Sequence, residues 1–193
     1  MALISNIVNT FYRFSSIDTC AVWHLISCSR LYTVTCENGC EFVMSGFVEY
    51  ECLYKPRKGT ERNELRARLA REKKLNKFAT VNMAIEDLQE VSRLEERRRL
   101  GRGELSAIAI AKKLNLGLTT DDRKAFRLAQ EELPDPIRVQ TIPQLLGWLL
   151  FIGVLTDGDV PNIIKEHTDL GGSHQSHFEE IYLEAMRCKL ASN

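Results

Sequence analysis

The sequence predicts an α/β protein whose parallel sheet is covered by helices on both faces. Segments with strand character alternate with helical segments through residues 1–143, and this alternation is typical of parallel sheets. One helical segment, residues 104–114, is apolar on nearly every face, as expected of a helix that is enclosed by other elements. Residues 144–193 show only helical patterns.

The N-terminal part supplies two strands and two helices. A short buried strand is expected at residues 14–19 (FSSIDT), followed by an apolar helix at 21–31. A second strand at 40–44 (CEFVM) is apolar and partly β-branched or aromatic, and Ser45 and Gly46 follow it. The next helix is expected at 48–53.

Two charged helices follow, at residues 61–77 and 85–100. The formal net charge of the chain is zero, from 26 basic and 26 acidic residues. That balance hides an asymmetry, because residues 55–77 hold ten basic and three acidic residues and residues 131–193 hold ten acidic and four basic ones. The basic stretch is either a surface that faces a polyanion or a solvated helix with ion pairs between neighbouring turns. Both interpretations stay open.

The second half supplies the other strands. The buried helix at 104–114 ends at Asn115, and a strand at 116–120 follows it and ends in two aspartates. A helix is expected at 123–131, and residues 137–142 (IRVQTI) alternate in polarity like a last strand. The expected sheet therefore has about four or five strands.

The chain is expected to divide into two parts. Residues 1–143 form the α/β core, with a basic helical insert at about 55–100, and residues 144–193 form a helical extension packed on that core. The extension contains three helical pieces, separated at 156–158 and at 171–172.

A cytoplasmic location is expected. The N-terminal segment has no basic region before an apolar run, as a signal peptide would. The most apolar stretch, residues 145–155, is shorter than the roughly 18 to 20 residues that span a bilayer. Six cysteines, five of them in the first 52 residues, are expected as reduced thiols because a chain of this size needs no disulfide framework.

Carboxylates stand where several predicted elements begin or end. Asp18 follows the first strand, and Asp121 and Asp122 follow the strand at 116–120. Glu104 lies in the first turn of the buried helix, and Glu51 lies in the helix after the second strand. In open α/β sheets ligands bind outside the carboxyl ends of the strands. Clustered carboxylates suit Mg²⁺ or Mn²⁺, and such ions can promote the hydrolysis of a phosphodiester.

Four segments resemble PIN domains. Residues 103–111 (GELSAIAIA) and 118–126 (LTTDDRKAF) are similar to the second half of PIN-like proteins that carry a GE-x-x-AI motif and then a T-D-D-R motif, relatives of the VapC toxins. Residues 16–19 (SIDT) match the opening strand of the family, and residues 45–53 (SGFVEYECL) match its helix with a Val-x-x-Glu pattern. The resemblance covers roughly residues 15–188. It implies a PIN-like three-layer α/β/α fold with extra C-terminal helices.

The resemblance also implies roles for individual residues. The catalytic and metal-binding carboxylates would be Asp18, Glu51, Glu104 and Asp122. Asp121 would either join them at the metal or point to solvent, and Thr19 and Thr120 would orient ligands or water. The bound ion would be Mg²⁺ or Mn²⁺, and no histidine or serine nucleophile would be required.

The expected function is that of a metal-dependent endonuclease acting on RNA or DNA, with RNA preferred. The resemblance suggests the toxin of a toxin–antitoxin or defence system, with an antitoxin or other protein partner and a homodimeric state. Nucleic-acid contacts are expected from the basic residues Arg62, Arg66, Lys73, Arg98, Arg102 and Arg123. The alternative is a non-catalytic PIN-like interaction module that binds a protein or a nucleic acid. A nucleotide-binding protein is disfavoured because no G-x-G-x-x-G or Walker A pattern occurs.

The histidines and cysteines give weaker indications of function. Cys36 and Cys40 together with His174 and His177 have the residue types of a Cys₂His₂ zinc site. The two pairs are far apart in the sequence, so ordinary packing is the preferred interpretation. His24, in the first helix, is expected to be a structural histidine with a satisfied hydrogen bond.

Overall fold

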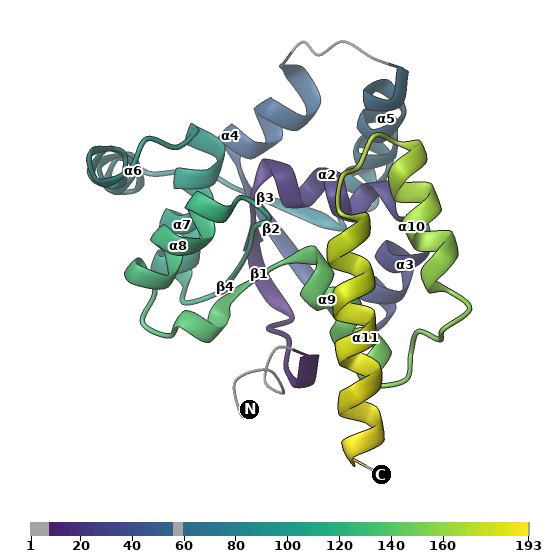
Figure 1. Ribbon diagram of the computed structural model, residues 1–193. Helices are drawn as coiled ribbons and strands as arrows, with labels where there is room; N and C mark the ends of the chain where they lie inside the picture. Colours follow the sequence, from purple (N-terminus) through teal and green to yellow (C-terminus); the bar gives the residue numbers. More distant parts are fainter. Residues whose placement is uncertain (1–7, 56–59, 193) are drawn as a thin grey trace.

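The computed structural model describes residues 8–55 and 60–192 and has a central sheet of five parallel strands. The strands lie in the order β3-β2-β1-β4-β5 (Figure 1). Their bounds are Phe14–Ile17 for β1, Glu41–Ser45 for β2, Phe78–Val81 for β3, Gly117–Thr119 for β4 and Val139–Gln140 for β5. The α/β class with a parallel sheet is confirmed.

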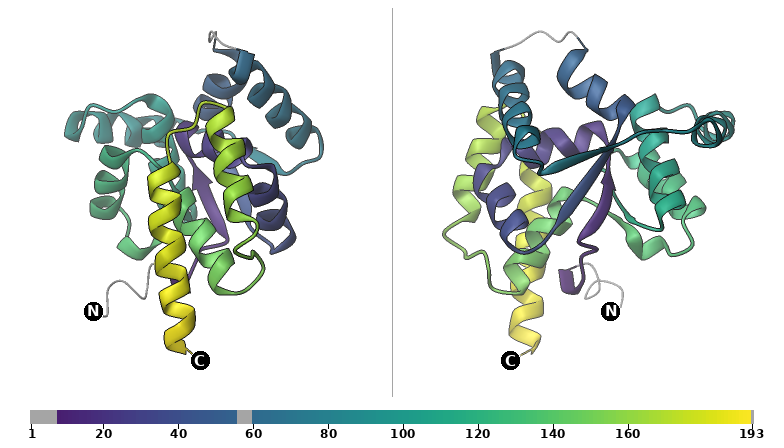
Figure 2. Two further views of the ribbon diagram at one scale, coloured as in Figure 1. Left: turned by 45° about the vertical axis from the view of Figure 1, so that its right-hand side comes forward. Right: turned by 180° about the vertical axis from the view of Figure 1, so that it is seen from behind.

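Helices cover both faces of the sheet, which makes three layers (Figures 1 and 2). Helices α6, α7 and α8 share one hydrophobic core, which includes Leu118 of β4. Helices α2, α3, α5, α9, α10 and α11 share the other, which includes Ile17 of β1. The first group spans Ile85–Arg97, Arg102–Leu114 and Arg123–Glu132. The second group spans Thr19–Ser27, Ser29–Glu37, Thr60–Lys74, Ile142–Phe151, Val160–Asp169 and Gln175–Ser192.

Strand β1 lies at the centre of the sheet and places the site. It pairs with β2 through Ser15 and Phe42 and with β4 through Ser16 and Leu118. The chain builds β2 and β3 on one side of β1, and β4 and β5 on the other. The connections therefore change direction between β1 and β4, which is where open α/β sheets leave a crevice for ligands.

Strand β3 was not expected from the sequence, and the prediction of one continuous helix at 61–77 was wrong at its end. Helix α5 ends at Lys74, and Asn76 turns the chain with a φ of 57°. Strand β3 then runs along the edge of the sheet beside β2. Because only Phe78 of this strand is buried, its sequence lacks the apolar pattern of a covered strand. The segment 55–100 thus contributes a strand as well as helices. Arg57 and Lys58 of its basic stretch lie outside the described residues.

Three further boundaries differ from the prediction. The helix expected at 21–31 is two helices, because α2 ends at Ser27 and α3 begins at Ser29. The helix expected at 48–53 is α4, Gly46–Glu49, followed by a π-helical turn η1, Tyr50–Tyr54. The last strand is only Val139–Gln140, because Pro136–Arg138 forms a 3₁₀ turn (η2) and Thr141 caps α9.

The C-terminal helices pack on the α/β core. Gly147 of α9 leaves room for α11, since a Cβ there would lie 2.7 Å from Cγ1 of Ile181. The three helices are separated near the expected positions, before Val160 and around Gly171. Within residues 8–55 and 60–192, no helix combines the length and the apolarity needed to cross a membrane.

An ion-pair network ties the three helices of one layer together. The carboxylate of Glu132, at the end of α8, contacts Arg93 and Arg97 of α6 and also Lys112 of α7, at 3.1 Å. The side chain of Glu132 is only 5% exposed, whereas that of Glu131 beside it is 47% exposed. A carboxylate with three cationic partners, shielded from water, contributes more than a solvated pair.

Replacement of Glu132 by glutamine is expected to lower the free energy of unfolding by about 1–3 kcal/mol, because three cations lose their shared anion. Replacement of Glu131 by glutamine is the matched control and should change it by less than about 0.5 kcal/mol. Urea denaturation followed by circular dichroism measures both. Equal effects of the two changes would contradict the assignment of the network to Glu132.

Candidate active site

Asp18 is a buried carboxylate at the carboxyl end of β1. One of its oxygens, Oδ1, accepts a hydrogen bond from the backbone N–H of Ala21 at 2.8 Å, so Asp18 caps helix α2. The hydroxyl of Thr120 donates to the other oxygen. The side chain has no solvent exposure, and burial raises the pKa of Asp18 to about 7, with the charges of Asp121 and Glu104 adding to the rise. Asp18 is thus fixed between the ends of β1 and β4.

Glu51 comes to the same edge from the π-helical turn η1. Its Oε2 accepts a hydrogen bond from the hydroxyl of Thr19 at 2.6 Å. The first turn of α7 packs against this pair, because a Cβ on Gly103 would lie 2.6 Å from Oε2 of Glu51 and 2.7 Å from Oγ1 of Thr19. Only a glycine at position 103 lets the backbone of α7 approach the two side chains this closely.

Glu104 and Asp122 complete a group of four carboxylates. Glu104 lies in the first turn of α7 and is half-buried, and its Oε2 is a buried atom without a hydrogen-bond partner among the described residues. Burial raises the pKa of Glu104, and the negative charges of Glu51 and Asp122 raise it further. Asp122 caps α8 by accepting from the N–H groups of Lys124 and Ala125, both at 2.8 Å.

These four carboxylates come from four different elements and interact electrostatically. Glu104 is coupled to Asp18, to Glu51 and to Asp122. Neighbouring like charges either take up protons or attract a cation. All the side-chain donors are oxygens, and one of them is buried without a partner. This donor set fits a hard divalent cation such as Mg²⁺ or Mn²⁺.

Asp121 lies next to this group but contacts different partners. Its Oδ2 is 2.8 Å from Nδ1 of His24, and its Oδ1 accepts from the N–H of Ile142 at 3.0 Å. The side chain is 1% exposed, so the expectation that it might point to solvent was wrong. Asp121 links the loop after β4 to α2 and to the start of α9.

Two cavities lie beside the carboxylates. One, of about 960 Å³, is lined by Asp122 and by Arg123. The other, of about 700 Å³, is lined by Glu51 and by Arg102, and Phe47 and Tyr50 form part of its wall. Two of the six basic residues expected to contact nucleic acid are therefore close to the carboxylates.

The other four basic candidates lie in different surroundings. Lys73 is held by Glu49 and by the hydroxyl of Thr80, and Arg66 donates to the carbonyl of Lys55 at 2.9 Å. Arg98 lies 3.6 Å from the carboxylate of Glu131. Arg62 is exposed and lines a separate cavity that also contains His24.

A second cluster of side chains, made of histidines, was not expected from the sequence. His24, His167 and His174 each offer a nitrogen, and these nitrogens lie within 4.8 Å of one another. His174 thus lies with two other histidines, and none of the six cysteines, which all fall within the described residues, forms a disulfide. No spacing motif could reveal the cluster, because its members come from α2, from α10 and from the segment before α11.

Two adjacent buried threonines provide a test of the site. The Thr120 hydroxyl donates to Asp18 and accepts from the N–H of Asp122 at 3.2 Å, whereas Oγ1 of Thr119 has no partner among the described residues. Thr120→Val is expected to lower the free energy of unfolding by about 1–3 kcal/mol, because it leaves a buried carboxylate without its donor. Thr119→Val should be neutral or stabilising. Urea denaturation measures both, and a neutral Thr120→Val would contradict the role given to its hydroxyl.

Comparison with known proteins agrees with this geometry. The family model of the PIN domain matches residues 17–131. The matched region holds Asp18, Glu51, Glu104 and Asp122. No curated protein matches the chain. Because the family model covers more than half of the 193 residues, the chain belongs to the PIN domain family, whose members are commonly nucleases.

Proposed function

We propose that this chain is a metal-dependent endonuclease that hydrolyses phosphodiester bonds in RNA, with Asp18, Glu51, Glu104 and Asp122 as the residues that hold Mg²⁺ or Mn²⁺. One observation carries the proposal. The buried Oε2 of Glu104 has no hydrogen-bond partner among the described residues, and the charges of Glu51 and Asp122 act on the same carboxyl group. A bound cation would satisfy that oxygen and neutralise the group.

The side chains around the carboxylates hold them in place. Asp18 is fixed by the N–H of Ala21 and the hydroxyl of Thr120, and Glu51 is fixed by the hydroxyl of Thr19. Such partners orient metal ligands and limit their rotation. When bound, a divalent cation supplies an activated water and stabilises the negative charge that develops on the phosphodiester. Without these three hydrogen-bond donors, the carboxylates would not be fixed in an arrangement that binds a metal ion tightly.

The two cavities suggest how a nucleic acid approaches. Arg102 and Arg123 stand in different cavities on either side of the carboxylates and can contact phosphates there. The guanidinium of Arg102 lies 5.8 Å from the ring centroid of Phe47, and Tyr50 is 55% exposed. Aromatic rings beside a cation are a surface on which unpaired bases stack. We therefore favour single-stranded RNA and assign the main contacts to Arg102 and Arg123, with Arg62 further away.

The family resemblance suggests a biological setting. We propose a toxin-like role in which an antitoxin or other protein partner controls the nuclease, and a homodimer as the working form. Six cysteines that form no disulfide with one another are consistent with a reducing compartment such as the cytoplasm.

A non-catalytic interaction module is the second candidate. It is favoured because many basic side chains form ion pairs within the protein. Arg68 pairs with Glu64 and Glu166, and Arg93 pairs with Glu90. The charge of these helices is thus partly balanced internally, which weakens their attraction for a nucleic acid. A module of this kind would keep the fold without cleaving RNA.

Replacement of Glu104 by glutamine, or of Asp18 by asparagine, is expected to lower Mn²⁺-dependent RNA cleavage by more than about 100-fold, as loss of a group that stabilises developing charge does. Cleavage of a fluorescent single-stranded RNA measures the rate. Glu131→Gln, on the exposed end of α8, is the control and should retain the wild-type rate. Unchanged cleavage by both folded variants would refute the proposed active site.

Metal addition separates the nuclease from the interaction module. Mn²⁺ is expected to raise the melting temperature of the wild-type chain, because a ligand bound only to the folded state stabilises it. In a chelator, Glu104→Gln should melt at a higher temperature than the wild type, since one of the repelling charges is gone. Scanning calorimetry measures both melting temperatures. Mn²⁺ should raise the melting temperature of Glu104→Gln less than that of the wild type. A wild-type chain that neither gains stability from Mn²⁺ nor binds it would favour the interaction module.

A further inference from the structure

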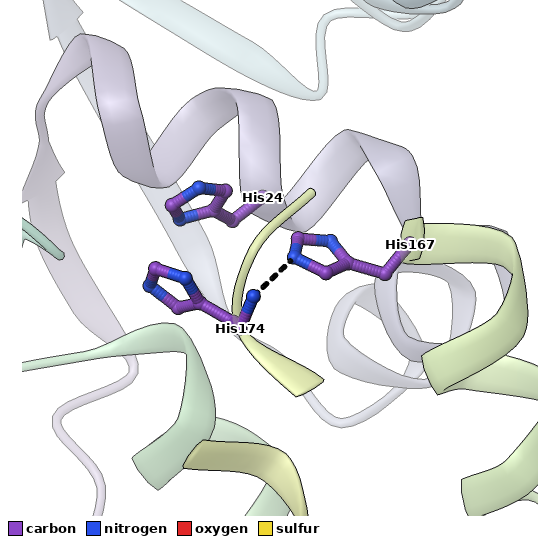
Figure 3. Close-up of side chains that lie close together, drawn as sticks. All are labelled: His24, His167 and His174. Atoms are coloured by element: carbon purple, nitrogen blue, oxygen red, sulfur yellow. Dashed lines mark hydrogen bonds between the residues drawn. The ribbon is translucent and has the colours of Figure 1, made fainter. Parts of the chain in front are cut away.

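Three histidines from distant parts of the sequence meet beside the carboxylates. His24 lies on α2, His167 lies in α10 and His174 lies just before α11 (Figure 3). The ring centroids of His24 and His174 are 3.9 Å apart, and those of His24 and His167 are 5.2 Å apart. One nitrogen of each ring lies within 4.8 Å of the others. This contact connects the C-terminal helices to α2.

The hydrogen bonds of His167 define which of its nitrogens carries the proton. The hydroxyl of Ser27 donates to the carbonyl of His24 at 2.7 Å, so its oxygen is free to accept from Nδ1 of His167 at 2.6 Å. Nε2 of His167 accepts from the backbone N–H of His174 at 3.3 Å (Figure 3). The proton is therefore on Nδ1, and the lone pair of Nε2 accepts the N–H of His174, so an ion bound to Nε2 would take the place of this hydrogen bond.

His24 and His174, unlike His167, each have a nitrogen that none of the hydrogen bonds above uses. Nδ1 of His24 donates to the carboxylate of Asp121 at 2.8 Å, and this leaves the lone pair on Nε2. Nδ1 of His174 is buried and has no hydrogen-bond partner among the described residues, and its Nε2 lies 3.8 Å from Oδ2 of Asp121. A buried polar atom without a partner is costly unless something else binds it.

Burial favours the neutral form of two of the rings. Burial lowers the pKa of His167 and of His174 to about 4 in each case, and the neighbouring His24 lowers both further. A neutral imidazole is the form of histidine that binds metal ions. The cluster therefore collects uncharged nitrogen donors, in contrast to the charged oxygens of the four carboxylates.

We propose that His24, His167 and His174 form a second metal site, which takes Zn²⁺ or a similar transition-metal ion through imidazole nitrogens. Zinc binds histidine nitrogens at about 2.0–2.1 Å, so ligands of a tetrahedral site are about 3.3 Å apart. The histidine nitrogens lie within 4.8 Å of one another, so the rings would have to turn toward a common point to bind the ion. Asp121 and Ser27 act as the hydrogen-bond partners that orient His24 and His167, as such groups do at zinc sites.

Each of the three histidines borders a cavity. His24, His167 and Ser27 line a cavity of about 220 Å³, and His174 lines the larger cavity that also contains Asp122. Gly172 makes room for the ring of His167, since a Cβ at that position would lie 2.2 Å from Nε2. An ion here would fasten α10 and the segment before α11 to α2, next to the carboxylates.

Cobalt titration tests the site, because Co²⁺ bound to several imidazoles in a tetrahedral site absorbs visible light far more strongly than Co²⁺ in an octahedral oxygen site. The wild-type chain is expected to bind one Co²⁺ with this intense absorption, and Zn²⁺ should displace it. Glu104→Gln should keep the signal. His24→Asn and His174→Asn should weaken Co²⁺ binding at this site by more than about 100-fold, and Ser27→Ala by about 10-fold. His177→Asn is the matched control, since His177 is exposed and outside the cluster.

X-ray absorption by the Zn²⁺-loaded wild-type chain gives a second readout that needs no variant. It should show about three histidine nitrogens bound to the ion. The proposal is overturned if the wild-type chain shows no intense cobalt absorption, if His24→Asn and His174→Asn bind Co²⁺ as the wild type does, or if the zinc spectrum shows oxygen ligands only. Glu104→Gln alters only the carboxylate site. The cobalt result therefore does not depend on whether the chain is a nuclease.

Discussion

The structure depends on one buried carboxylate at the centre of its sheet. Asp18 ends the middle strand, caps α2 through the N–H of Ala21 and accepts the hydroxyl of Thr120 from the neighbouring strand. A charge without solvent exposure needs such partners, and burial still raises its pKa to about 7. Asp18 therefore joins β1, the end of β4 and the start of α2 at one point.

At the end of β4, the consecutive residues Asp121 and Asp122 face two different groups of side chains. Asp122 caps α8 and is coupled to the carboxylate Glu104, whereas Asp121 holds His24 and the start of α9. The oxygen group favours hard ions and the imidazole group favours softer ones. The two proposed sites can lie side by side because adjacent residues at a strand end face different partners.

The charged helices illustrate how tertiary contacts redistribute charge. From the sequence, the basic stretch could face a polyanion or be neutralised by its neighbours. Arg68 is paired with Glu166 of α10 as well as with Glu64 one turn away, and Lys73 is held by Glu49. Arg102 and Arg123 instead line the two cavities that flank the carboxylates. The proposed nucleic-acid contacts therefore depend on where a basic residue lies relative to the carboxylates, and not on how many basic residues surround it in the sequence.

The sequence by itself determined the α/β class, the buried helix α7 and the element ends that carry Asp18, Glu104 and Asp122, because strand and helix periodicity are local properties of the chain. It did not indicate β3, since an edge strand with one buried residue has no pattern to detect. Only the tertiary structure decided that Asp121 turns to His24 and that His24, His167 and His174 meet. Those contacts join residues far apart in the chain, and their geometry arises only when the helices pack.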